Sequence, residues 1–366
     1  MSETATWDFI LNNEIEKINK NLNIGEENKD KNNKENKEIK GGGYNDLDIN
    51  QNNIGGSIIK IDNVNNLNNS IKEIFENKNN ECSHALDIKK NDSCVGNKFY
   101  EKIINDSNIK NGGVGNDNIT YNILSTIKDR FKCDDERCVL TKIRDNPNFS
   151  KFINIHQIDD MIKRYFKPEG PSETFNFLSN HNIDNVLNQF FHKYNDPKNK
   201  FYNIKFQMRD FAENNTELTE INFYQKINDE NYKTFAVVFN TDYSNGIGIH
   251  WFCIFIDARD DDKIDIEYFN SSGRNPLKEI EVFLVGLEKD LKNQFKGRRK
   301  VNYKIVSNSR FQDDNHSCGV WSLSYIWLRL EGIPTAWFNP SNIDDSTMHL
   351  LRKYFFNTDN KKIKII

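Results

Sequence analysis

The pair Cys318–Gly319 is where the residue types in this 366-residue chain most favour covalent chemistry. A thiol must ionise before it attacks a carbonyl carbon, and the unpaired N–H groups at a helix N-terminus favour the thiolate. Gly319 would let a substrate backbone approach closely, because it has no side chain. We therefore expect Cys318 to begin a helix, to have a lowered pKa beside a protonated histidine, and to act as a nucleophile.

Three more polar residues have the types that such a nucleophile requires. His250 can act as general base, and Asn270 can accept a hydrogen bond from one imidazole nitrogen, which fixes the tautomer of the ring. The amide of Gln312 and the backbone N–H of Cys318 can both donate to the oxyanion that forms during acyl transfer. Losing one such donor typically raises the barrier by roughly 3–4 kcal/mol. The four residues predict cysteine-protease chemistry.

These residues lie at the ends of the expected helices and strands, where a rigid scaffold can present side chains to a cleft. The run 251–256 is apolar on both alternating faces, which is typical of a central strand. The expected order is strand, strand, strand, helix, strand, helix, over residues 235–239, 251–256, 264–270, 276–295, 301–306 and 318–331. This order predicts an α+β domain of roughly 200 residues.

The alternation of side chains within 264–270 favours Asn270 over its acidic neighbours. Successive residues of a strand point to opposite faces, so Tyr268 and Asn270 share one face while Asp265 and Glu267 share the other. Each candidate alone has an ordinary structural interpretation, since a buried thiol, a structural histidine and a turn-forming asparagine are all common. Their combination favours a catalytic site, although chain order does not establish proximity.

Bulk properties exclude several other classes of protein. The net charge is -4 and the pI about 6.0, which gives no support for binding nucleic acid or an anionic membrane. We expect no signal peptide, because the first residues contain no apolar stretch, and no membrane helix. The six cysteines are expected to be thiols in a reducing compartment. We also expect no cofactor and no metal: Cys133 and Cys138 read as two thiols in a loop, and His316 is assigned to the surface.

The first part of the chain has a different composition from the rest. It is rich in Asn, Lys and Glu and poor in aromatic residues, so it cannot bury enough apolar surface to offset its conformational entropy. We expect a mostly disordered extension over 1–115, with short helical patches near 7–20 and 68–78, then a helical arm domain over 116–166 and a catalytic domain over 167–366. Glycine-rich stretches at 41–43, 55–57 and 112–114 are hypothetical self-processing sites or simple spacers.

Three motifs resemble the Ulp/SENP and adenovirus-type cysteine proteases. They are Gly-Ile-His-Trp at 248–251, Tyr-Phe-Asn-Ser-Ser at 268–272, and Gln312 separated by five residues from Cys318–Gly319. The order His, Asn or Asp, Gln, Cys is that of these enzymes and differs from papain, where the cysteine comes first. Position 270 holds an asparagine where the cellular enzymes have an aspartate, and in this the chain resembles the viral branch of the family, of the African-swine-fever type. That likeness runs from about residue 125 to residue 357.

The resemblance implies a papain-like, Ulp-type core, with a central mixed sheet flanked by helices and preceded by a small helical arm domain. It implies that Trp251, Phe177 and Gly319 bind substrate, although plain core packing is an alternative for Trp251. It also implies an endopeptidase that cleaves viral structural polyproteins at Gly-Gly-X sites during virion maturation, in the host cytoplasm and the virion. A narrow tunnel can select glycine by excluding every side chain.

Three other functions remain open at this stage. The chain could be a deconjugase acting on a ubiquitin-like protein, or an acetyltransferase of related fold that uses the same Cys-His pair. It could also be a non-catalytic binding module, which the complete set of four residues disfavours. We expect no membrane or nucleic-acid partner, and the sequence does not indicate an oligomeric state.

Overall fold

The computed structural model describes residues 64–86, 88–106, 123–147, 149, 154–171, 176–214, 216–306 and 309–357. The three glycine-rich stretches at 41–43, 55–57 and 112–114 lie outside these ranges, as does the expected helical patch near 7–20. Statements about structure below refer to the described residues.

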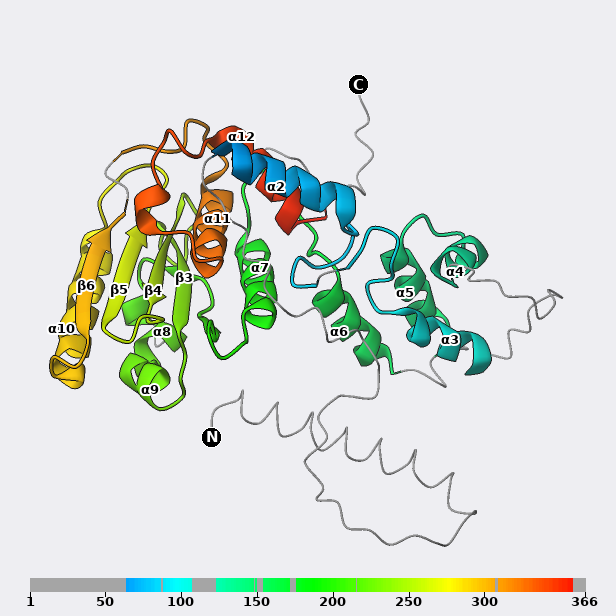
Figure 1. Cartoon of the computed structure of the whole chain (residues 1–366), viewed down its shortest axis with the longest axis horizontal. Coiled ribbons are helices and arrows are strands. Elements are labelled where there is room, and N and C mark those ends of the chain that lie inside the picture. Colours follow the sequence, from blue (N-terminus) through cyan, green and yellow to red (C-terminus); the bar gives the residue numbers. More distant parts are fainter. Residues whose placement is uncertain are drawn as a thin grey trace, which may run out of the picture. The chain divides into compact units, whose positions relative to one another are not determined.

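One mixed sheet organises the catalytic part of the described chain (Figure 1). Its path is β1-β3-β4-β5-β6, with β2 also paired to β3. Strands β3, β4 and β5 are antiparallel neighbours, whereas β1 and β2 pair with β3, and β6 with β5, in parallel. The strands are Phe201–Asn203 (β1), Gln207–Met208 (β2), Thr234–Asn240 (β3), Trp251–Asp257 (β4), Lys263–Phe269 (β5) and Lys300–Ile305 (β6). The predicted α+β class, with a central mixed sheet, is confirmed.

Both faces of the sheet are buried, which explains the apolar run in β4. Cys253 and Phe255 face one core, while Phe252 and Ile254 face the other. Fully burying a large apolar side chain contributes about 1.5–3 kcal/mol, so β4 is held from both sides. Its place in the middle of the sheet fixes the position of the residue before it, His250.

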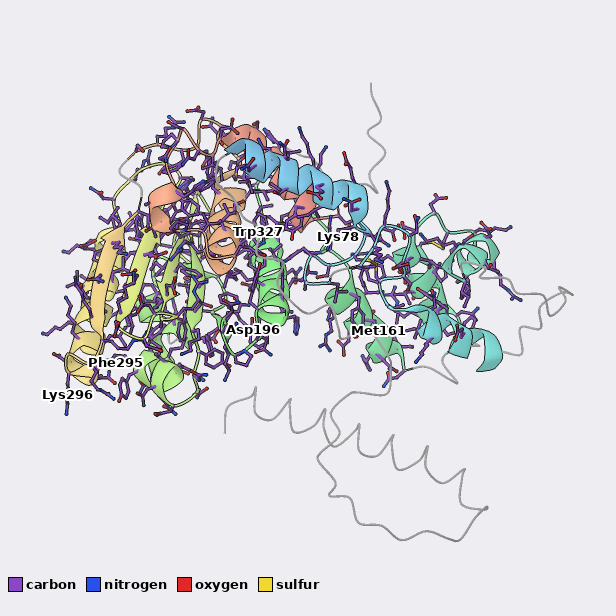
Figure 2. The ribbon with its side chains drawn as sticks, viewed as in Figure 1. Lys78, Met161, Asp196, Phe295, Lys296 and Trp327 are labelled. Atoms are coloured by element: carbon purple, nitrogen blue, oxygen red, sulfur yellow. A yellow bond between two sulfur atoms is a disulfide. The ribbon has the colours of Figure 1, made fainter. Side chains whose placement is uncertain are left out.

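Helices cover the two faces of the sheet in separate groups (Figure 1). The first core is completed by α2 (Val64–Asn77), α7 (Asn180–Lys193), α11 (Cys318–Leu330), η4 (Thr335–Trp337) and α12 (Asp345–Phe355). The second is completed by η3 (Phe211–Glu213), α8 (Glu217–Glu220), α9 (Phe223–Asn228) and α10 (Lys278–Phe295). Trp327 of α11 is fully buried in the first core, against the rings of Tyr354 and Phe355 (Figure 2).

Local signals define the ends of two helices that matter here. Ser179 caps α7: its hydroxyl accepts from the backbone N–H of Asn182, whose side chain accepts from the N–H of Ser179. This capping box fixes the chain directly after Leu178. At the other end of the domain, α10 stops at Phe295, where Lys296 adopts a left-handed φ of 50° (Figure 2).

Four short helices share a separate core: α3 (Asn97–Asp106), α4 (Ile123–Phe131), α5 (Glu136–Asp145) and α6 (Ile155–Tyr165). The buried carboxylate of Glu136 in α5 joins this helix to α3 and to the loop before α3. It accepts hydrogen bonds from the hydroxyls of Ser93 (2.6 Å) and Tyr100 (2.9 Å) and from the backbone N–H of Cys94 (2.8 Å). A buried carboxylate needs such donors, because an unpaired charge in a core is costly.

Helices with buried side chains lie within the range 1–115, where a mostly disordered extension was expected. Leu67 and Ile71 of α2 are fully buried against the catalytic core, and Tyr100 of α3 is buried in the helical core. Few apolar residues are involved, which is why a composition rich in Asn and Lys conceals them. The helical patch expected near 68–78 lies within α2.

The expectation that all six cysteines are thiols is wrong for four of them. Disulfides join Cys82 to Cys94 and Cys133 to Cys138. The interpretation of the second pair as a loop with two thiols is therefore corrected: Asp135 caps α5 by accepting from the N–H of Cys138 (2.6 Å), and the turn brings the two Cα atoms to 5.6 Å. Both disulfides lie within the helical core.

Among the described residues, no helix is both long enough and apolar enough to span a membrane. The longest helix that shapes the second core, α10, carries charged residues along its length.

Candidate active site

Cys318 is the first residue of α11, as predicted, and its side chain is almost completely buried. The backbone N–H groups of Trp251 and Gly319 act on its sulfur, since both lower the pKa of the thiol. Because Trp251 directly follows His250, the start of β4 and the start of α11 meet at this point. The structure thus brings the expected nucleophile next to the residue that follows the expected base.

His250 and Asn270 form a direct hydrogen bond, with 2.8 Å between Nε2 of the ring and Oδ1 of the amide. The amide is itself held in place. Its Oδ1 also accepts from the backbone N–H (3.0 Å) and the hydroxyl (2.8 Å) of Ser272, and its Nδ2 donates to the hydroxyl of Tyr268 (3.0 Å). Asn270 therefore orients the imidazole through an amide group that Ser272 and Tyr268 hold in place with three hydrogen bonds.

The pKa of the thiol differs from the expectation. Burial raises the pKa of Cys318 above its ordinary value, and hydrogen bonds from the N–H groups of Trp251 and Gly319 only partly offset it. Burial likewise lowers the pKa of His250, despite its bond to Asn270. The expectation of a thiolate beside a protonated histidine is thus corrected: at neutral pH the free site holds a neutral thiol and a neutral imidazole.

Gln312 lies in the loop after β6, and its amide group is anchored at both ends. Its Oε1 accepts from the hydroxyl of Ser271 (2.8 Å), and its Nε2 donates to the backbone oxygen (2.9 Å) and to Oδ1 (3.0 Å) of Asp314. The Ser271 contact couples Gln312 to the strand end that carries Asn270. To donate to an oxyanion, the amide must exchange a contact to Asp314 for one to the substrate.

Two neighbours of the site were missed by the sequence analysis. Asp314 accepts from the backbone N–H groups of His316 (3.0 Å) and Ser317 (2.9 Å), so it shapes the turn into α11. Its position just ahead of a helix start is the local signal that was available. Arg352 of α12 is buried, and it donates to the backbone carbonyls of Asn176 (3.0 Å) and His316 (3.4 Å). No local pattern announces it, because the contact depends on tertiary packing.

The three residues expected to bind substrate differ in exposure. Phe177 is 57% exposed, whereas Trp251 is buried and its indole N–H donates to the carbonyl of Leu178 (2.9 Å). Gly319 is also buried: a Cβ at this position would lie 3.0 Å from the side chain of Leu178. Leu178 therefore packs against Gly319, the residue after the nucleophile, and also contacts Trp251. His316, which was assigned to the surface, is instead mostly buried beside Asp314.

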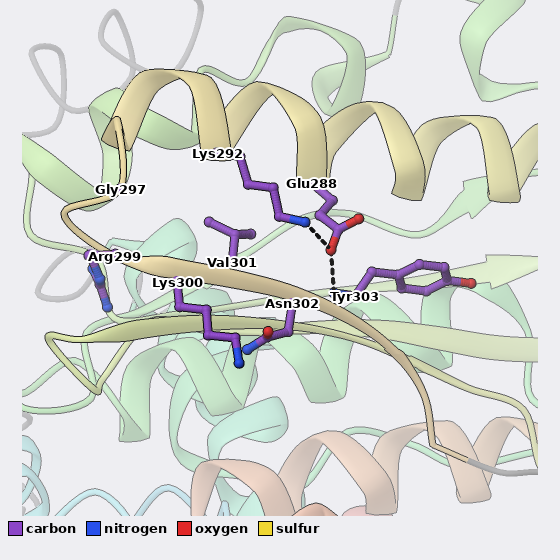
Figure 3. A pocket seen from close by; sticks show the side chains of 8 residues that line it. All are labelled: Glu288, Lys292, Gly297, Arg299, Lys300, Val301, Asn302 and Tyr303. Atoms are coloured by element: carbon purple, nitrogen blue, oxygen red, sulfur yellow. Dashed lines mark hydrogen bonds and ion pairs between the residues drawn. The ribbon is translucent and has the colours of Figure 1, made fainter.

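A cavity of about 350 Å³ lies between α10 and β6 (Figure 3). No expected catalytic residue lines it. Lys292 pairs with Glu288 (3.0 Å), and Arg299 donates to the backbone carbonyls of Ala258 (2.8 Å) and Lys263 (2.9 Å). Arg299 therefore holds the loop between α10 and β6 in place, which is a structural role for one of the basic residues at 296–300.

Replacing Asn270 with alanine is expected to lower kcat/KM about 2- to 12-fold. A neutral hydrogen bond contributes about 0.5–1.5 kcal/mol, and the imidazole would lose the acceptor that orients it. Steady-state cleavage of a peptide at fixed pH measures the effect. The conservative variant Asn270→Asp retains an acceptor and adds a negative charge, which should raise the pKa of His250 in NMR titration. An unchanged kcat/KM in Asn270→Ala would contradict the positioning role.

Comparison with known proteins gives three findings. No family model matches the chain. Over 301 residues the chain is 29% identical to the SUMO-1 cysteine protease of African swine fever virus, covering 78% of this chain and 98% of the relative. It is 28% identical over 251 residues to a protein of Acanthamoeba polyphaga mimivirus that bears the name of a thiol protease, covering 66% of this chain and 76% of the relative.

A solved structure agrees with these sequence matches. The crystal structure of the African swine fever virus protease superposes with a TM-score of 0.58 at 26% identity, and the match covers 77% of this chain and 97% of that one. A match of this length is longer than the catalytic part of the chain, so it includes more than the mixed sheet and its flanking helices.

Proposed function

We propose that this chain, a cysteine protease homologous to the African swine fever virus enzyme, cleaves viral structural polyproteins at Gly-Gly-X junctions during virion maturation. Cys318 is the nucleophile, His250 the general base and Asn270 the residue that orients the base. Gln312 and the backbone N–H of Cys318 donate to the oxyanion. The proposed locations are the host cytoplasm and the virion.

One observation supports the assignment of roles: His250, Asn270 and Cys318 meet at the ends of three separate elements. His250 is hydrogen-bonded to Asn270, and the backbone N–H of Trp251, the residue after His250, lowers the pKa of the Cys318 thiol. The sequence separates these residues by up to 68 positions, so their meeting is a property of the fold. A nucleophile, a base and an orienting group together are what acyl transfer through a thiol requires.

The reaction begins with a neutral thiol and a neutral imidazole. When a substrate carbonyl lies above the sulfur, the imidazole of His250 takes the thiol proton as the carbon–sulfur bond forms. The tetrahedral oxygen accepts hydrogen bonds from the N–H of Cys318 and the amide of Gln312. The imidazolium then protonates the leaving amine as the peptide bond breaks, and water, deprotonated by His250, hydrolyses the thioester.

The packing around Gly319, the residue after the nucleophile, supports the selection of glycine. A Cβ on Gly319 would lie 3.0 Å from Leu178, and Trp251 is buried with its indole N–H bonded to the carbonyl of Leu178, so we infer that a substrate residue here also has little room for a Cβ. Fitting extra atoms into a packed space typically costs about 1–3 kcal/mol. We therefore infer that a Gly-Gly segment fits and that any larger residue is excluded by contact.

Peptides that differ by one methyl group test this proposal. Matched peptides containing Gly-Gly-X, Ala-Gly-X and Gly-Ala-X should differ about 5- to 150-fold in kcat/KM in favour of Gly-Gly-X, because each alanine costs about 1–3 kcal/mol. In the variant Leu178→Ala the discrimination should shrink, with folding checked by circular dichroism. Mass spectrometry identifies the cleaved bond, and Cys318→Ser controls for contaminating proteases. Equal cleavage of the three peptides would contradict the selection of glycine.

A second candidate is a deconjugase acting on a ubiquitin-like protein, because the viral relative is named a SUMO-1 cysteine protease. A SUMO conjugate run beside the peptide panel distinguishes the two. The proposal expects polyprotein-derived Gly-Gly-X peptides to be cleaved at least as efficiently as the conjugate. Preferential cleavage of the conjugate would favour the second candidate, and cleavage of neither would contradict both.

A further inference from the structure

Asp314, His316 and His349 bring one carboxylate and two imidazoles together beside the start of α11. One ligand atom from each of the three lies within 4.8 Å of the others. Oδ2 of Asp314 and Nε2 of His316 are 3.2 Å apart, and each of these side chains is less than one-fifth exposed. Two residues come from the loop before Cys318 and one from α12, so the cluster joins separate elements.

We propose that these three side chains form a binding site for one divalent transition-metal ion of the zinc class. Two imidazoles and a carboxylate are ligands that Zn²⁺ and Co²⁺ accept, with water in a fourth position. Metal–nitrogen and metal–oxygen bonds of about 2.0–2.2 Å can be reached from this arrangement by small side-chain rotations. The inference departs from the sequence expectation that the chain holds no metal, and it does not depend on the proposed substrate.

The backbone around the cluster is held by hydrogen bonds, which favours a preformed site. The N–H of Asp314 donates to Oδ2 of Asp345 (2.9 Å), and the N–H of His316 donates to Oδ1 of Asp314 (3.0 Å). Arg352 donates to the carbonyl of His316 (3.4 Å) from one turn beyond His349 on α12. The loop and the helix are thus already connected where the ion would bridge them.

The charges at the cluster also favour a cation. Asp314 accepts hydrogen bonds from the backbone N–H groups of His316 and Ser317 through Oδ1 and from the hydroxyl of Ser317 through Oδ2, so its carboxyl group is held in one orientation. Asp345 adds a second carboxylate nearby, while Arg352 supplies one positive charge. Two negative groups therefore face one positive group, which leaves room for a dication.

Occupancy would bear on the residues that precede the nucleophile. Asp314 accepts from the amide of Gln312 through Oδ1, while Oδ2 is the oxygen that faces His316. An ion held by Oδ2 would fix this carboxylate and with it the hydrogen bonds that position Gln312. Metal binding would thereby couple the concentration of the ion to the position of the Gln312 amide, the proposed oxyanion donor.

The test is a Co²⁺ titration of the full chain carrying Cys318→Ala and no affinity tag, which removes the catalytic thiol as a competing ligand. We expect one Co²⁺ per chain, a visible spectrum without thiolate charge transfer, and a Tm that rises with metal concentration. Adding His349→Ala should weaken binding by more than about 100-fold, since loss of even an outer-shell partner costs about 10- to 100-fold. The exposed His156 provides the matched control His156→Ala.

Two results would overturn the proposal. One is the absence of stoichiometric Co²⁺ binding in the Cys318→Ala protein, because the three side chains would then not bind the metal ion by themselves. The other is unchanged affinity in His349→Ala relative to His156→Ala. If His349→Ala does not fold by circular dichroism, His349→Gln or His316→Gln takes its place, and the same loss of Co²⁺ affinity is required.

Discussion

Replacing Cys318 with serine is expected to abolish peptide cleavage and to leave the fold intact. Loss of the nucleophile in a hydrolase lowers kcat by up to about 10⁶-fold, and we expect a loss of at least about 10⁴-fold here. The serine hydroxyl is close in size to the thiol and can still accept from the N–H of Trp251, so the packing at the start of α11 is retained. Peptide turnover and circular dichroism measure the two parts of the prediction.

The chain supplies a matched control in Cys253, which is not in a disulfide and is also buried. It lies in β4 within the core, so Cys253→Ala should keep its kcat. Iodoacetamide should modify Cys318 alone, and because burial raises the pKa of that thiol, the rate should climb as pH rises from neutral toward that pKa. Turnover that survives in Cys318→Ser, or is lost in Cys253→Ala, would contradict the assignment.

The sheet could be predicted from the sequence because its strands bury both faces. The continuous apolar run in β4 and the alternation in β5 are direct consequences of burial, and the bounds observed differ from those expected by one residue or so. By contrast β1 and β2 contain three and two residues. Strands this short have no periodicity to detect, and their pairing with β3 comes from tertiary context.

The N-terminal helices and the disulfides could not be predicted for a different reason. Among the side chains of α2 that the structure describes, only Leu67 and Ile71 are fully buried, and the polar residues between them give the composition of a disordered segment. Cys82 and Cys94 are joined across a sequence separation of 12. Spacing alone does not distinguish a disulfide from two thiols, since the outcome depends on whether the fold brings the Cα atoms together.

At the candidate site, residue types could be predicted but protonation states could not. The types and element ends of His250, Asn270 and Cys318 follow from local sequence. The pKa of Cys318 depends on how deeply α11 is buried, and here the loss of solvation exceeds the effect of the helix N-terminus. The hydrogen bond from the Gln312 amide to Asp314 is local, but it requires one specific turn of the loop that the residue types alone do not determine.

Replacing Arg329 with methionine is expected to lower the free energy of unfolding by about 3–5 kcal/mol, because it leaves a buried charge without its partner. Glu267 of β5 is fully buried, and the Arg329 guanidinium binds both of its carboxylate oxygens, at 2.8 and 2.9 Å. The same guanidinium donates to Asp257 (2.8 Å), so one cation joins β4, β5 and α11. Urea unfolding measures the loss, and the double variant Glu267→Leu/Arg329→Met should recover part of it, since no buried charge at position 267 remains.

The pH dependence separates this cause from simple loss of packing. Burial raises the pKa of Glu267, although Arg329 and Tyr325 oppose the shift. Without Arg329 the folded-state pKa rises further above the unfolded value, so the variant loses stability relative to wild type as pH rises through that pKa and regains it as pH falls. The matched control Arg209→Met breaks a more exposed pair with Glu279 and should cost less than about 1 kcal/mol. A pH-independent loss in Arg329→Met would indicate that packing, and not the uncompensated carboxylate, determines its stability.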